Sequence, residues 1–393
     1  MLLSLGENRV MAVLCVLAIT TIYYVFYFIG FSESQSDGGA LLLLLKLLSV
    51  AFFTIFSLIF NSLFSRKNSA LYLFYVTIFF GLIILLIKST FYGFGDLKYF
   101  NVIISCLPFL LFDLNKSLKF HHAFFKALVI VLLIQIALDF YILFSGLSLW
   151  ENKAFIGGVG NANSFGFICN LAISYLLYCK RLDAKYIACI SLLSLGVLFT
   201  SSLMSVLFMM LNYLAYSLKR NLLFTILVCI MFVLSIVLFY EYFMSDHLKF
   251  KIESLMSLLS GEGGNQSRSV SLRVHIYSIF FDNLTNNFLY LLLFGYQNYS
   301  YYIADSQFLT YFGSFGLLWS FVFFAFLFTT LCRARFVLKN EFLTMVMLQF
   351  ILYFIVNRIL DYYPIPLILF LVITLIWRFD NDFIKTRSAC VRT

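Results

Sequence analysis

The sequence has few charged residues, few prolines and no nucleotide or metal motif. Charged residues make up 11% of its 393 residues, whereas an ordinary soluble domain contains about a quarter. There is no P-loop, which argues against an ATPase, and no HExxH, paired acidic or Cys/His spacing suited to a metal ion. With three prolines and little charge inside its apolar runs, the chain lacks the features of a proton-driven transporter. We therefore expect no cofactor and no metal.

The eight cysteines contain no CxxC pair. Nearly all of them lie inside apolar runs or on the side predicted to be cytoplasmic. This distribution argues against both a disulfide framework and a zinc site.

The chain is rich in apolar and aromatic residues, at 63% and 20%, and its mean hydropathy is +0.98. A water-soluble fold could not bury that much apolar surface, so the excess must face lipid. The apolar runs are long enough for helices that cross a bilayer. We therefore expect an all-α, polytopic integral membrane protein with about twelve transmembrane helices.

Twelve runs could each cross the hydrocarbon. They lie at 10–31, 40–64, 70–87, 99–112, 124–147, 163–179, 186–200, 203–218, 222–243, 307–331, 341–357 and 364–377. The first run follows Arg9 and has no cleavage site, so we interpret it as a retained span. The seventh and eighth form one stretch, which we expect to be split at Thr200–Ser202 into a tight antiparallel hairpin.

The basic residues predict the orientation. Of the 27 Lys and Arg residues, 18 fall on alternate connections and at the two ends, and 8 fall on the opposite side. The positive-inside rule places the larger set in the cytoplasm together with both termini. The smaller set is Lys88, Lys98, Lys153, Lys249, Lys251, Arg268, Arg273 and Arg358.

One outer connection is much longer than the others. Residues 244–305, roughly 60 in number, form a large loop inside what we expect to be a single transmembrane domain covering 1–393. A structureless loop of that length is unusual, which predicts a functional element. Apolar spacing predicts one amphipathic helix over 249–259 and a second helix over 269–281.

The outer connection at 151–166 is rich in glycine and asparagine. Asn161 or Asn163 could cap the helix that follows it. The connection could also form an anion or sugar site, because helix N-termini offer unpaired N–H groups. Both interpretations remain open from the residues alone.

Arg268 and Arg273 lie in the large loop, on the side that the positive-inside rule depletes of arginine. They could clamp a phosphate or carboxylate through two parallel hydrogen bonds. The alternative is a solvated charge, or an ion pair with a nearby acidic residue. His275 is either a proton shuttle or an ordinary surface side chain.

Three carboxylates stand near or inside the predicted spans. Asp305, at the outer start of the span at 307–331, is a candidate general base or else a helix N-cap. Arg358 and Asp361 are three residues apart, which favours a structural ion pair. Asp139 is costly to bury, so we expect it to face the helix bundle or a water cavity.

The sequence resembles the superfamily of bacterial O-antigen polymerases (Wzy-type) and O-antigen ligases. Residues 160–166, GNANSFG, resemble the family's Gly-Asn-Pro-Asn turn, with Ala162 in place of proline. The hairpin at Thr200–Ser202 resembles the Thr-x-Ser-Arg turn of these enzymes. The segment 267–316 resembles their large loop, where an Arg-bearing helix leads to Leu-Phe-Gly at 293–295.

The resemblance implies a GT-C-like fold in the bacterial inner membrane and a periplasmic active site. The implied activity is a metal-independent glycosyltransferase, a repeat-unit polymerase acting on oligosaccharides linked to undecaprenyl diphosphate. Asp305 would be the catalytic base, where ligases carry a His. The diphosphate and glycan would be bound by Arg273, Arg268, Lys153, Asn161, Asn163, His275 and Arg358.

Two other functions remain open: an O-antigen ligase and a flippase or other transporter of lipid-linked oligosaccharides. The expected partners are the lipid-linked oligosaccharide and membrane lipid, with a chain-length regulator and a flippase as candidate protein partners. The net charge of +9 follows the topology pattern, so nucleic acid is not expected.

Overall fold

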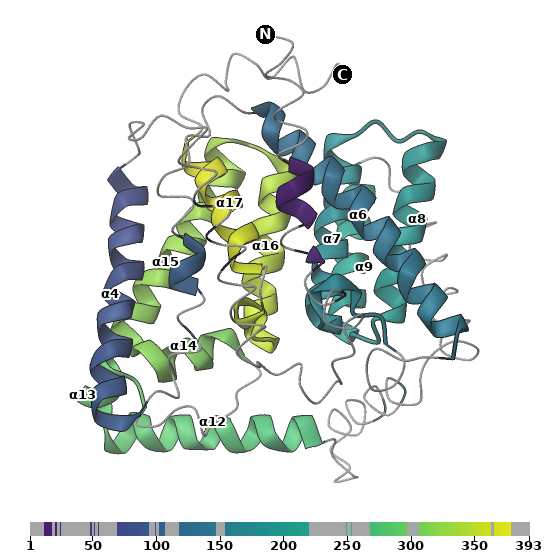
Figure 1. The fold of residues 1–393 in the computed structure, drawn as a ribbon. Coiled ribbons are helices and arrows are strands. Elements are labelled where there is room, and N and C mark those ends of the chain that lie inside the picture. Colours follow the sequence, from purple (N-terminus) through teal and green to yellow (C-terminus); the bar gives the residue numbers. More distant parts are fainter. Residues whose placement is uncertain are drawn as a thin grey trace. The chain divides into compact units, whose positions relative to one another are not determined.

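The computed structural model describes residues 12–17, 20–21, 24, 48, 51, 54, 69–93, 99, 102–106, 118–146, 154–219, 249, 253, 268–296, 306–362 and 365–378. Over these residues the chain is helical and has no strand, which confirms the all-α class (Figure 1). It divides into two compact units, Met1–Leu43 with Lys119–Val270 and Leu44–Leu118 with Ser271–Thr393.

Four helical segments are long and apolar enough to cross a membrane: Ala70–Tyr92, His121–Phe144, Ala162–Cys179 and Leu317–Val337. Shorter apolar helices at Ala184–Phe199, Leu203–Ser217, Glu341–Val356 and Ile365–Trp377 coincide with four further predicted runs. The protein is therefore embedded in a membrane through helices, as its composition predicts. The predicted runs at 10–31, 40–64, 99–112 and 222–243 lie wholly or mostly outside the described residues.

Helix α7 (Ala162–Cys179) is the centre of the first unit, and every residue from Ser164 to Leu177 is buried. It packs against α8 (Ala184–Phe199) and α9 (Leu203–Ser217). Gly166 permits the close approach to α9, because a Cβ there would lie 2.3 Å from the Ser205 Oγ. Small residues at such contacts are typical of helices that associate in membranes.

The predicted hairpin between α8 and α9 is confirmed. Ser201 adopts a positive φ of 53°, and Ser202 is the N-cap of α9, accepting a hydrogen bond from the Ser205 backbone nitrogen at 3.3 Å. The reversal is thus made by one left-handed residue followed by a side-chain cap.

In the second unit, α15 (Leu317–Cys332) packs against α4 (Ser69–Tyr92), α16 (Glu341–Val356) and α17 (Ile365–Arg378). Aromatic rings fill these contacts. Phe74 of α4 stacks on Phe326 of α15 with ring centroids 4.0 Å apart, and Phe326 stacks on Trp377 of α17 at 5.2 Å. The Trp319 indole also donates to the Thr77 carbonyl at 2.6 Å.

The predicted run at 307–331 is not one helix, which corrects the sequence interpretation. Gly316, with φ of 87°, separates α14 (Gln307–Phe315) from α15, and α14 lies crosswise to α15 (Figure 1). Gly295 packs against this break, because a Cβ on it would lie 2.1 Å from the Gly313 oxygen. Irregular backbone inside a membrane protein is tolerated where protein buries it.

Lys88 stabilises the end of α14 at this break. It lies within α4, not in the outer connection to which the sequence assigns it, and is only 2% exposed. Its ammonium donates to the carbonyl oxygens of Gly313 and Ser314 at 3.0 and 3.1 Å. A cation at these carbonyls in the last turn of α14 stabilises the helix end.

The segment 244–305, predicted to be a large loop, contains α12 (Arg268–Asn286) and α13 (Phe288–Leu293). The helix predicted at 269–281 is therefore confirmed and is longer than expected. Most of the helix predicted at 249–259 falls outside the described residues.

Candidate functional site

The glycine-rich connection of the first unit forms a 3₁₀ turn, η5 (Gly157–Val159), followed by α7. Asn161 is the N-cap of α7, and its side-chain oxygen accepts from the Ser164 backbone nitrogen at 3.1 Å. This confirms the capping interpretation, in which an asparagine satisfies one of the free amides at the helix start.

Asn163 connects this turn to the hairpin between α8 and α9. The Ser202 hydroxyl donates to the Asn163 side-chain oxygen at 2.6 Å, and the Ser205 hydroxyl donates to Ser202 Oγ at 2.9 Å. One side-chain hydrogen bond, between Ser202 and Asn163, therefore joins two segments nearly forty residues apart in the sequence. They are the segments that carry the resemblance at 160–166 and at Thr200–Ser202.

A line of buried polar contacts continues from this junction between α7 and α9. The Asn170 side-chain nitrogen donates to the Ser205 carbonyl at 2.8 Å, and the Ser174 hydroxyl donates to the Asn212 side-chain oxygen at 2.9 Å. All four residues are fully buried. Hydrogen bonds of this kind join helices whose remaining surfaces are apolar. They hold α7 and α9 together, and the glycine-rich turn leads directly into α7.

Two polar residues of α6 (Leu118–Phe144) anchor the other side of the turn. Asp139 is 3% exposed and accepts from the Gly157 backbone nitrogen at 2.9 Å and from the Tyr24 hydroxyl. Gln135 accepts from the Gly158 backbone nitrogen at 3.3 Å and donates to the Thr20 carbonyl at 2.9 Å. The expectation that Asp139 faces the interior is confirmed.

These contacts narrow what the turn can bind. The N–H groups of Gly157 and Gly158 are not available to an anion, because Asp139 and Gln135 already accept from them. Other polar groups of this segment are the side chains of Asn161 and Asn163 at the start of α7. Amide side chains suit a sugar hydroxyl better than a phosphate, because they carry no charge.

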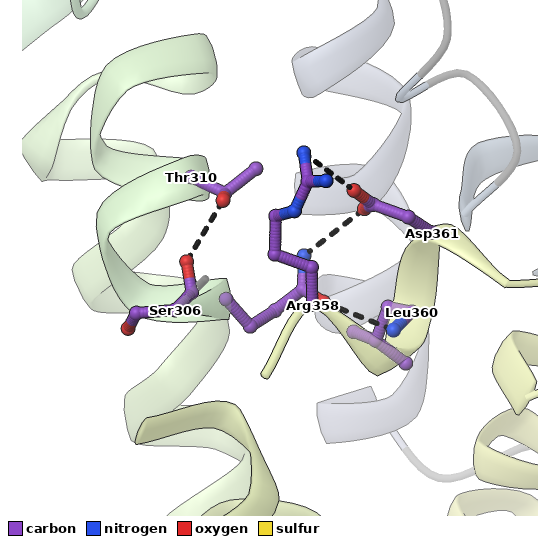
Figure 2. Close-up of polar contacts among 6 residues, drawn as sticks. Ser306, Thr310, Arg358, Leu360 and Asp361 are labelled. Atoms are coloured by element: carbon purple, nitrogen blue, oxygen red, sulfur yellow. Dashed lines mark hydrogen bonds and ion pairs between the residues drawn. The ribbon is translucent and has the colours of Figure 1, made fainter. Parts of the chain in front are cut away.

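A second cluster lies at the start of α14, in the second unit (Figure 2). Arg358 and Asp361 form an ion pair of 3.5 Å, each with a side chain about one-fifth exposed, which confirms the expected pairing. Asp361 ends a 3₁₀ turn, η8 (Ile359–Asp361), that follows α16. The pair therefore lies in this turn and not on the preceding long helix.

Gln307, the first residue of α14, holds this turn in place. It is fully buried; its side-chain oxygen accepts from the Leu360 backbone nitrogen at 2.9 Å, and its nitrogen donates to Asp361 at 3.4 Å. The Asp361 carboxylate thus contacts both a guanidinium and a neutral amide. Arg358 is fixed at the start of α14 and remains partly open to solvent.

Asp305 immediately precedes this cluster and lies outside the described residues. The N-cap residue of α14 is Ser306, one residue later than the capping interpretation of Asp305 requires. The Ser306 hydroxyl donates to the Phe354 carbonyl at 3.1 Å and makes no side-chain cap. Both interpretations of Asp305, general base and helix cap, therefore stay predictions.

Arg268, Arg273 and His275 all lie on α12. His275 is exposed, and its backbone carbonyl accepts from the Ser278 hydroxyl at 2.7 Å. The side chains of both arginines lie outside the described part of the chain, as does the whole of Lys153. Their role as a diphosphate clamp stays a prediction.

The structure therefore brings together Asn161 and Asn163 in the first unit and places Arg358 beside Asp361 in the second. Sequence analysis missed Gln135 and Gln307 as positioning residues. The role of Gln135 could have been predicted from the sequence, because it is a polar residue four positions before Asp139 and so lies on the same helix face. Comparison of the chain with protein-family models and with curated proteins gave no match.

Proposed function

We propose that the chain is a polymerase that joins lipid-linked oligosaccharide repeat units at the outer face of a bacterial inner membrane. In this reaction the anomeric C–O bond between a glycan and undecaprenyl diphosphate breaks. A new bond forms between the anomeric carbon and a hydroxyl oxygen of a second lipid-linked unit. The hydroxyl proton passes to a base, and undecaprenyl diphosphate leaves.

The hydrogen bond between Asn163 and Ser202 is the observation that most supports this proposal. The resemblance rests on short motifs whose meaning depends on their order and spacing. Motifs that belong to one site must lie close together in the fold. This hydrogen bond joins the asparagine turn to the hairpin turn. Side-chain hydrogen bonds also join other helices in membranes, so the support comes from which two turns this one joins.

The proposal gives each predicted residue a role. Arg268, Arg273 and Lys153 would stabilise the leaving diphosphate, since a guanidinium fork matches phosphate oxygens without a metal. Asp305 would accept the hydroxyl proton. The remaining polar residues, Asn161, Asn163, His275 and Arg358, would bind the glycan.

Deleting the gene from its host and separating the surface polysaccharide by gel tests the proposal. Loss of a polymerase leaves a product with a single repeat unit, and the full ladder returns when the gene is restored. Polymer that accumulates on its lipid carrier would instead identify a ligase. Repeat units trapped on the cytoplasmic face would identify a flippase.

A reconstituted assay separates the activity from other effects of the deletion. Full-length protein in lipid nanodiscs is incubated with lipid-linked repeat units and a metal chelator. We expect longer glycans together with released undecaprenyl diphosphate, because no step of the proposal uses a metal. An intact substrate in this assay would contradict the proposal.

A further inference from the structure

Helix α12 has two apolar faces and one polar face. By helical spacing, one apolar face contains Tyr277, Phe281 and Leu284, and the other contains Ile279 and Phe280. The polar face contains His275, Ser278 and Asp282. A helix with one apolar face would need only one apolar neighbour, so α12 requires two.

Protein covers the second of these faces. The Phe280 ring lies 6.2 Å from the Tyr296 ring and 6.0 Å from the Phe312 ring of α14, measured between centroids. Residues 279 and 280 are partly buried. This face is therefore explained by packing inside the second unit.

The other apolar face is open in the described structure. Tyr277 is 40% exposed and Phe281 is 59% exposed. The open surface continues on α13, where Phe288, Leu289 and Leu293 are 48%, 73% and 47% exposed. Adjacent exposed apolar side chains of this kind indicate a surface that is covered by lipid or by a protein partner.

The neighbours of α13 indicate what covers it. Tyr290 packs edge to face on Tyr92, with ring centroids 6.1 Å apart. Tyr92 ends the membrane-spanning segment Ala70–Tyr92, whose own outward residues Phe80, Ile83, Leu86 and Phe91 are 49–75% exposed. The open surface of α12 and α13 is thus next to the end of a lipid-facing helix, and tyrosines are typical of that depth.

The direction of α12 fits the same position. Within the second unit, α12 runs crosswise to α4 and α15, at the same end as α13 (Figure 1). A helix perpendicular to membrane-spanning helices lies parallel to the membrane plane. The membrane surface then meets one long side of α12 over its whole length, as in amphipathic helices that bind at the interface.

We infer that α12 and α13 form an in-plane anchor whose open apolar face, Tyr277, Phe281, Phe288, Leu289 and Leu293, inserts between the lipids of the bilayer surface. The lipid is preferred to a protein partner because the face is continuous with the outward side of α4. This inference does not depend on the proposed enzymatic function.

One consequence does rest on the proposed function. Since α12 is parallel to the membrane, all its residues lie at nearly the same depth. Arg268 and Arg273 would then be held at the level of the lipid headgroups, which is where the diphosphate of a lipid-linked donor lies. Arginines at this depth would contact the leaving diphosphate while the polyprenyl chain stays in the bilayer.

Quenching by brominated lipid tests the anchor directly. Tyr277→Trp and Phe281→Trp are made in the full-length protein, each reconstituted as one copy per nanodisc of phosphatidylethanolamine and phosphatidylglycerol with bromine near the acyl carbonyl. The matched controls are Ser278→Trp and Asp282→Trp, one residue further along the same helix. The native tryptophans give a background common to all four variants, measured on the parent protein.

We expect bromine to remove a larger share of the added fluorescence at 277 and 281 than at 278 and 282. Equal quenching at the four positions would overturn the anchor. Absent quenching at 277 and 281 would overturn it as well, because it would mean that protein or water covers this face. The polymerase assay uses unbrominated nanodiscs, so failure of the proposed function and failure of the anchor are distinguishable.

Discussion

The Asp139 carboxylate accepts a hydrogen bond from the backbone nitrogen of Gly157 at 2.9 Å. A buried carboxylate in a helix long enough to span a membrane is costly unless it is well hydrogen-bonded. Here it fixes the turn that carries Asn161 and Asn163 to the body of α6. The relationship explains why an acidic residue is found inside an otherwise apolar run.

The first prediction concerns this anchor. Asp139→Leu should leave the Gly157 amide and the Tyr24 hydroxyl without their acceptor, at a cost of about 1–3 kcal/mol for each buried group. Asp139→Asn retains one acceptor oxygen and should cost less. Thermal unfolding in detergent measures both, and Ile134→Leu, at a half-exposed position five residues earlier in the same helix, is the control. Equal melting temperatures for Asp139→Leu and the parent would show that the contact does not stabilise the turn.

The second prediction concerns the contact between the two motifs. Asn163→Ala and Ser202→Ala each remove one partner of the 2.6 Å hydrogen bond. If the bond holds the two turns together, the double variant should lose little more than Ser202→Ala, which also removes the cap of α9, and the coupling energy should be about 0.5–3 kcal/mol. Polymer yield and thermal unfolding are measured for all four proteins. Additive losses in both measurements would mean that the turns act independently.

The third prediction concerns the diphosphate clamp. Arg273→Ala should abolish polymerisation at a normal protein level, and Arg273→Lys should restore only part of it because the guanidinium fork is lost. Arg268→Ala should have a similar but weaker effect. Arg335→Ala, at an exposed position, is the matched control. A full polysaccharide ladder from Arg273→Ala would remove this residue from the site.

The fourth prediction concerns the base. Asp305→Asn preserves the shape of the side chain but cannot accept the proton, a contribution commonly worth about 10²–10⁴ in rate. The variant should express normally and produce single repeat units only. Ser306→Ala should still make polymer, because it loses one hydrogen bond to the Phe354 carbonyl, worth about 0.5–1.5 kcal/mol. Wild-type polymer from Asp305→Asn would move the search for a base to His275 or Asp361.

The fifth prediction concerns topology and follows from the distribution of basic residues. Reporter tags at residue 67, at residue 183 and at the C-terminus should be active only in the cytoplasm. A tag at residue 262, in the large loop, should be active only on the opposite side. A cytoplasmic signal at residue 262 would contradict both the topology and the proposed mechanism.

Much of the fold could be predicted from the sequence, because length and hydropathy are local properties. The helices at 70–87 and 163–179, the hairpin at Thr200–Ser202 and the helix at 269–281 all follow from runs or apolar spacing. The break at Gly316 could not be predicted in this way. The run as a whole is apolar enough for one span, and the break depends on contacts with Gly295 and Lys88, which lie outside it in the sequence.

The candidate site was less predictable than the fold. The sequence offered two interpretations of the glycine-rich connection, and only the contacts of Asp139 and Gln135 decide which amides are occupied. The role of Gln307 depends on its contact with Leu360, more than fifty residues later. Contacts between distant segments leave no periodic signal in a single sequence.

The position of Lys88 also constrains the order in which the protein assembles. Its acceptors, the carbonyls of Gly313 and Ser314, follow it by 225 and 226 residues. During synthesis from the N-terminus, α4 is therefore made long before α14 exists. Until then the ammonium must remain hydrated at the membrane edge, which a long, flexible lysine stem permits. The ammonium becomes buried when α14 packs against α4. The second unit can therefore complete its packing only after the C-terminal third of the chain has been synthesised.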